Sequence, residues 1–198
     1  MSVSRHLLSR FVWQSIVFLS ICCLLTGTSV APVSIDDLFK QADLVAIVHI
    51  LSGDSEHYPV TVYKGKVETA VKGTATGEII YFGPYVSYGV GSEYLVFLRK
   101  SEKGIEPRDK SSGINYGSVP TFFQGMYGGF SIMPIEYACV FEGKEVSQQC
   151  DYAVKLNPEQ TILPPGIQAF LRGEVGAATN SDKWVRREAI VSFLKYRL

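Results

Sequence analysis

The sequence predicts a mainly β protein, a β-barrel with flanking helices, and three observations carry this prediction. An apolar run rich in β-branched residues covers 44–51 and ends at Ser52-Gly-Asp, and it is too short for an ordinary core helix. Residues 77–82 and 93–100 read as two further strands. The segment between them, 83–91, contains several glycines and a proline, which mark a loop.

The stretch 58–72 alternates in places and is interrupted by Gly65, which predicts a long strand with a bulge or a sharp bend. A small closed barrel uses such a strand to turn a corner. A return strand is expected within 122–133, entered through a glycine-containing turn. Val140-Phe141 and Val146 flank a Glu-Gly-Lys turn, so a hairpin is expected between residues 139 and 150.

Helices are expected at both ends of the barrel. Ser34 can cap a short helix over 34–42, with Asp36 and Asp37 at its positive end. Pro164-Pro165 is expected to start a second helix over 166–172, and an apolar stripe predicts a third over 183–198. Residues 32–198 are therefore expected to form one domain, with a barrel core at about 42–155 and a helical segment at about 156–198.

The N-terminal segment 1–31 reads as a signal peptide. It carries Arg5 and Arg10 and no acidic residue, followed by an apolar stretch over 11–25 and by small residues up to Ala31. That stretch is shorter than the roughly 20 residues that a transmembrane helix needs. Cleavage after Ala31 and secretion to the periplasm or the extracellular space are predicted, with an uncleaved membrane anchor at 11–25 as the alternative because Pro32 would follow the cut.

Two cysteines remain once that segment is removed. Cys22 and Cys23 lie within it, whereas Cys139 and Cys150 lie in the mature chain. In an oxidising compartment, two cysteines most simply form one disulfide, and here it would close the predicted hairpin.

Charge argues against a nucleic-acid partner. The full sequence has 19 basic and 19 acidic residues. Removal of residues 1–31 takes away two arginines and no acidic residue, so the mature chain has 17 basic and 19 acidic residues. Phosphate recognition needs clustered lysines and arginines, and the mature chain shows no such cluster.

The order of the strand motifs resembles a known superfamily. Ala42-Asp-Leu-Val, Tyr58-x-Val-x-Val, Val71-Lys-Gly and Gly91-x-Glu-Tyr-Leu-Val-Phe occur in the order seen in the tissue inhibitors of metalloproteinases and the wider netrin-module superfamily. The resemblance covers roughly residues 36–100 and implies a five-stranded OB-type barrel with one N-terminal and two C-terminal helices.

The resemblance fails at the residue that carries inhibition in that superfamily. The inhibitors chelate the zinc of a protease through a mature N-terminal cysteine, and no cysteine lies near any plausible mature N-terminus here. The resemblance therefore implies the fold and an extracellular protease as one candidate partner, but not the zinc-chelating mechanism.

Four residues form a candidate metal site. Asp54, Glu56 and His57 lie in the loop after the first strand, and His49 lies on that strand. A carboxylate beside a histidine can bind a metal or move a proton. The alternatives are a polar loop at 54–57 and a half-buried, hydrogen-bonded His49 that shares a face with Ile47 and Leu51.

Tyr85, Val86 and Tyr88, in the loop 83–91, form a candidate partner-binding site. Tyrosines on exposed loops are common anchors for protein partners. The alternative is aromatic packing over the rim of the barrel.

No catalytic residue is predicted, because the sequence contains no nucleophile elbow, phosphate-binding loop or dinucleotide fingerprint. The favoured interpretation is an exported, non-enzymatic module without a cofactor that binds a protein partner. A metal-binding protein or metal-dependent enzyme and a membrane-anchored structural protein are the alternatives.

Overall fold

The computed structural model describes residues 31–84, 88–108, 117–141, 148–157, 161–171 and 183–197. Residues 1–30 of the predicted signal peptide lie outside these ranges, as do Tyr85, Val86 and the turn between β7 and β8.

The predicted N-terminal helix is confirmed as α2, Ile35–Gln41. Ser34 is its N-cap, and its hydroxyl accepts the backbone N–H of Asp37 at 3.0 Å. Such a cap satisfies one of the amide groups that the first turn leaves without a partner. Ile35, Leu38 and Phe39 are the buried residues of this helix, which packs against the barrel strand β5.

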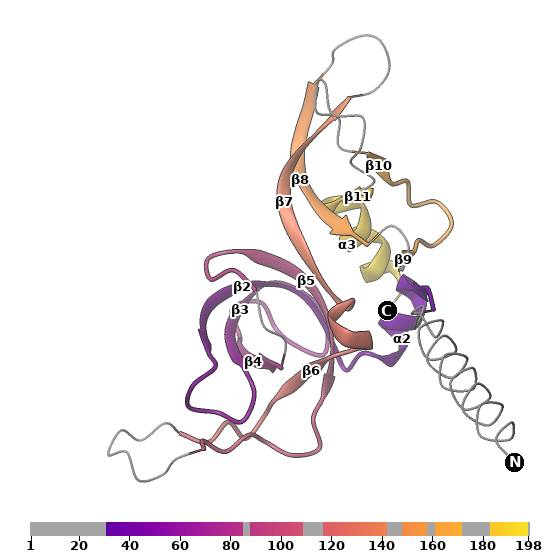
Figure 1. Cartoon of the computed structure of the whole chain (residues 1–198). Coiled ribbons are helices and arrows are strands. Elements are labelled where there is room, and N and C mark those ends of the chain that lie inside the picture. Colours follow the sequence, from indigo (N-terminus) through magenta and orange to yellow (C-terminus); the bar gives the residue numbers. More distant parts are fainter. Residues whose placement is uncertain are drawn as a thin grey trace, which may run out of the picture. The chain divides into compact units, whose positions relative to one another are not determined.

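Five strands close into a barrel, as the sequence and the resemblance predicted. They are β2 (Leu44–Asp54), β3 (Val62–Lys72), β4 (Ile79–Gly83), β5 (Glu93–Lys100) and β6 (Phe123–Gly125). β2 pairs with β3 and β5, β3 pairs with β4, and the short β6 closes the ring by pairing parallel to β4 and antiparallel to β5. This connectivity is that of an OB-type barrel, and Figure 1 shows its curled strands.

The long apolar run of β2 has a structural reason. Ala46, Val48 and Ile50 belong to the barrel core, whereas Val45 and Ile47 belong to a second core that includes residues of α2 and of the C-terminal helix. A strand that is buried on both faces reads as continuously apolar rather than alternating.

Gly65 lies on β3 opposite Ile50, beside a break in register where Ile50 and Ser52 of β2 face consecutive residues of β3. A Cβ atom at position 65 would lie 2.3 Å from Val48 Cγ1 and 3.2 Å from Phe82 Cε1. The predicted irregularity is therefore present, and the glycine is required by close packing inside the barrel.

A second set of strands extends the sheet from β5. β7 (Ile132–Phe141) follows the 3₁₀ turn η1 (Tyr127–Gly129) and pairs with β5 and β8 (Gln148–Leu156), and β8 pairs with β11 (Lys183–Arg186). β10 (Phe170–Leu171) pairs with β11, and β1 (Val33–Ser34) pairs with β9 (Thr161–Ile162) in a separate two-stranded sheet. The β7–β8 hairpin leaves the barrel at β5 (Figure 1).

The predicted helix at 166–172 is wrong. Ile167 donates its N–H to the carbonyl of Pro164 at 3.2 Å, and Gly166 has a φ of 90°. A proline followed by a glycine at positive φ is the signature of a type II turn, so Pro164-Pro165-Gly166 makes a turn and does not begin a helix. Residues 170 and 171 then form β10.

The predicted helix over 183–198 is confirmed only from residue 187 onward. The predicted helical segment 156–198 therefore also contains strands. Residues 183–186 form β11, and α3 spans Arg187–Tyr196. Trp184 and Val185 are buried in the sheet against β8. Pairing with an open sheet edge outweighed the helical periodicity of these four residues.

Candidate functional site

Asp54 and His57 form a hydrogen-bonded pair where β2 ends. The Asp54 carboxylate accepts the backbone N–H groups of Glu56 and His57, each at 3.0 Å, and His57 Nδ1 lies 3.0 and 3.1 Å from its two oxygens. Burial raises the pKa of Asp54, but these hydrogen bonds together outweigh burial, so that the pKa lies below its ordinary value. The pair fixes the turn that follows β2.

This turn packs against the segments on either side of residues 109–116. The Tyr58 hydroxyl donates to the Gly117 carbonyl at 2.8 Å, and the Arg108 N–H donates to the His57 carbonyl at 2.7 Å. Tyr58, Val62, Val119 and Phe122 form a small buried cluster beneath these bonds. Asp54 and His57 therefore belong to a packed loop junction.

The structure brings only part of the predicted metal site together. Glu56 meets Asp54 through its backbone N–H, whereas His49 lies between Lys66 of β3 and Glu93 of β5, half-buried, five positions before Asp54 on β2. Within the part of the chain that the structure describes, no group of three or more His, Cys, Asp or Glu side chains is placed to hold a metal ion. Zinc sites use three or four protein ligands.

Of the predicted partner-binding residues, the structure describes Tyr88. Its ring centroid lies 5.1 Å from those of both Tyr63 and Tyr94 and 6.4 Å from that of Phe82, and its backbone N–H donates to the Tyr63 hydroxyl at 3.3 Å. Tyr88 therefore takes part in aromatic packing over the barrel, which was the alternative interpretation of this residue.

An exposed aromatic pair lies on the β7–β8 hairpin, where the sequence predicted a disulfide but no partner-binding site. Tyr137 and Tyr152 are direct cross-strand neighbours, with ring centroids 5.6 Å apart in an edge-to-face arrangement. They are 61% and 50% exposed. On the other face of the hairpin, Ala138 is buried in a cluster with Trp184. The hairpin thus has one face that is covered at Ala138 and Ala153 and one face that presents two tyrosines.

The sequence holds a signal for this pair. Tyr137 precedes Cys139 by two positions and Tyr152 follows Cys150 by two, so any hairpin that sets the cysteines opposite each other also pairs the tyrosines. The register does place Cys139 opposite Cys150. The predicted disulfide is compatible with this register and stays a prediction.

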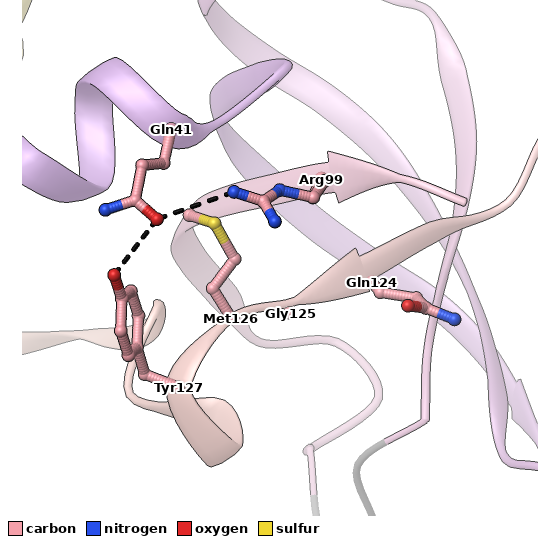
Figure 2. Close-up of a pocket in the computed structure, with 6 residues that line it drawn as sticks. All are labelled: Gln41, Arg99, Gln124, Gly125, Met126 and Tyr127. Carbon is pink, nitrogen blue, oxygen red and sulfur yellow. Dashed lines mark hydrogen bonds between the residues drawn. The ribbon is translucent and has the colours of Figure 1, made fainter. Parts of the chain in front are cut away.

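A pocket of about 290 Å³ lies where the end of α2 meets β5 and β6. Its lining residues are Gln41, Arg99, Gln124, Gly125, Met126 and Tyr127 (Figure 2). Gln41 Oε1 accepts the Tyr127 hydroxyl at 3.0 Å and Arg99 Nη2 at 3.4 Å. The sequence does not reveal this pocket, because its residues come from three separate segments and no motif links them.

No family model, no curated protein and no solved structure matches the chain. Among the described helices, none combines the length and the apolar character needed to cross a membrane.

Proposed function

We propose that the chain is an exported binding module and that it binds an extended, basic segment of a protein partner along the outer half of the β7–β8 hairpin. The observation that carries this proposal is the exposed Tyr137–Tyr152 pair on a ribbon with open edges. Tyrosine is enriched in protein interfaces because it supplies a large contact area at a small cost in conformational entropy.

The open edges follow from the pairing. β5 pairs with β7 only over 132–135, and β11 pairs with β8 only over 153–156. Beyond these ranges, no other described strand pairs with the outer sides of 136–141 and 148–152. An extended peptide can add to such an edge through backbone hydrogen bonds, and here it would continue the position that β5 occupies beside β7.

Charge favours a basic segment. The described residues of this outer half include Glu136 and Asp151 and no lysine or arginine. Glu136 and Asp151 lie on the face of the hairpin opposite to the tyrosines. Lys or Arg side chains at successive positions of an extended partner segment would therefore meet the acids on one face and the tyrosine rings on the other, where cation–π attraction stabilises the contact. An extracellular protease, the candidate from the resemblance, is one protein to test for such a segment.

Export and a Cys139–Cys150 disulfide belong to the same proposal. A covalent link two positions from Tyr137 and Tyr152 would hold the ribbon in register at the place where neighbouring strands no longer support it. The mass of the protein recovered from its host decides both points. Loss of residues 1–31 and a mass two hydrogen atoms below that of the reduced chain are expected.

The partner is tested by photo-crosslinking in the native host. The full chain carries a photo-reactive residue at the exposed position Glu136, and crosslinked peptides from envelope and medium are sequenced. One protein, attached through a segment that contains lysine or arginine, is expected. The double variant Tyr137→Ala/Tyr152→Ala should lose this product, whereas Tyr196→Ala, a change at a 91% exposed tyrosine on α3, should keep it.

Equal capture by the double variant, or no capture by the unaltered hairpin, would contradict the proposal. A further readout separates edge pairing from side-chain contact alone. Hydrogen exchange should slow at the alternate amides of 136–141 that point away from β8 when the partner segment binds, because edge pairing occupies those backbone groups.

A further inference from the structure

The pocket between α2, β5 and β6 contains a cation, Arg99, that forms no ion pair with any residue in the part of the chain that the structure describes. Among the described residues, no acidic side chain lies within ion-pair distance of the Arg99 guanidinium, whose one recorded hydrogen bond is the 3.4 Å contact with Gln41. The nearby Asp43 carboxylate accepts the backbone N–H of Lys100 at 2.8 Å. Most of the donor capacity of Arg99 is therefore unused by the acidic residues that the structure describes.

Two donors converge on one neutral oxygen in this pocket. The Arg99 guanidinium and the Tyr127 hydroxyl both point toward Gln41 Oε1, as Figure 2 shows. Because a guanidinium can only donate, the amide must present its oxygen and not its nitrogen. A charged guanidinium and a hydroxyl bind an ionised oxygen more strongly than an amide oxygen. An ionised oxygen in the position of Gln41 Oε1 would therefore be a stronger acceptor for both donors.

The backbone holds Tyr127 in an unfavourable conformation. Its φ is 50°, and Gly128 and Gly129 follow at 66° and 99°. Non-glycine residues in this region typically cost about 1 kcal/mol or more. The buried Ser131 hydroxyl accepts the Met126 N–H at 2.7 Å and anchors the turn from below. This arrangement sets the tyrosine ring at the wall of the pocket.

We propose that this pocket binds a carboxylate, with the Arg99 guanidinium and the Tyr127 hydroxyl as its donors. The incoming carboxylate replaces Gln41 Oε1 as the shared acceptor, and the Gln41 side chain turns away toward solvent. A volume of about 290 Å³ lies at the lower end of the range for small-molecule sites, which suits a single residue or a small acid. The site is separate from the β7–β8 hairpin and does not depend on the proposed function.

The test is titration of the full chain with N-acetylalanine, followed by NMR at the Arg99 Nε–H group and by calorimetry. N-acetylalanine methylamide is the matched neutral probe. Binding of the acid with a shift of the Arg99 resonance, and no binding of the amide, is expected. Tripeptides with a free C-terminus, with an amidated C-terminus and with an internal glutamate then distinguish a chain terminus from an acidic side chain and from a small free acid.

Substitutions at positions 41 and 99 sharpen the test. Arg99→Gln should weaken binding of the acid about tenfold or more, because a charged hydrogen-bond partner is lost. Gln41→Glu places a carboxylate of the protein itself against both donors and should abolish binding, whereas Gln41→Ala should retain it. Arg108→Gln, at an exposed arginine on another loop, is the control and should bind as the original chain does.

Each of these variants should keep the melting temperature of the original chain, because the altered side chains are largely exposed. Equal affinity for the acid and the methylamide, unchanged binding in Arg99→Gln, or no response of the Arg99 resonance to any carboxylate would overturn the proposal. Because the probes do not involve the hairpin, these outcomes are independent of partner capture at Glu136.

Discussion

Strand β2 and the outer half of the β7–β8 hairpin are both antiparallel β structure, but they bury very different surfaces. β2 has a paired strand on each side, and most of its residues are buried. The outer hairpin has one partly covered face and one face with two half-exposed tyrosines, and its outer edges are open among the described strands. Closure of the barrel pairs its strand edges with one another and so stabilises it. The outer hairpin instead keeps open strand edges and an exposed face to which a partner can bind.

The largest effect is expected inside the barrel. Phe82→Ala should lower the free energy of unfolding by about 3–5 kcal/mol, because Phe82 is fully buried and the barrel cannot collapse around the cavity. Urea denaturation measures this change, and Phe82→Leu should cost much less. If Phe82→Ala lowered the free energy of unfolding no more than replacement of an exposed tyrosine by alanine does, the barrel and the hairpin would not differ in the surface that they bury.

Loss of the predicted disulfide should act on the hairpin. Cys139→Ser should lower the free energy of unfolding by about 3 kcal/mol by the chain-entropy estimate. Hydrogen exchange should quicken in the outer parts of β7 and β8 and stay slow in β2. If exchange accelerated equally in both, the hairpin would not be a separate unit of stability.

Tyr88 gives an intermediate case at the rim of the barrel. Tyr88→Ala should cost about 2 kcal/mol, because its ring contacts with Tyr63 and Tyr94 are lost. Tyr88→Phe, which keeps the ring, is the control and should be close to the original chain in thermal denaturation. An unchanged stability of Tyr88→Ala would contradict this packing role and favour the prediction that Tyr88 anchors a partner.

The smallest effect is expected at Asp54. Its folded-state pKa is lowered, so its ionised form stabilises the fold above the unfolded-state pKa, and this contribution is lost as the pH falls through the folded-state value. Asp54→Asn should therefore cost about 1 kcal/mol at neutral pH, and the difference should shrink below about pH 4. Urea denaturation of both proteins across this pH range provides the check, and a difference independent of pH would contradict it.

Some elements were predictable because they depend on neighbours in the chain. The cap at Ser34 and the apolar runs of β2 and β5 are local signals, and both led to the observed elements. The errors at 166–172 and 183–186 have different causes. A local type II turn at Gly166 replaces the first helix, whereas long-range pairing of β11 with β8 overrides the helical periodicity of 183–186.

The candidate sites divide in the same way. Asp54 and His57 are three positions apart, and the sequence by itself determined that they meet. Only the tertiary structure decided that His49 lies apart from them, that Tyr88 is packed and that Tyr137 and Tyr152 form an exposed pair. It also decided that Gln41, Arg99 and Tyr127 share a pocket, because their positions depend on closure of the barrel by β6 and on the docking of α2, both of which are long-range contacts.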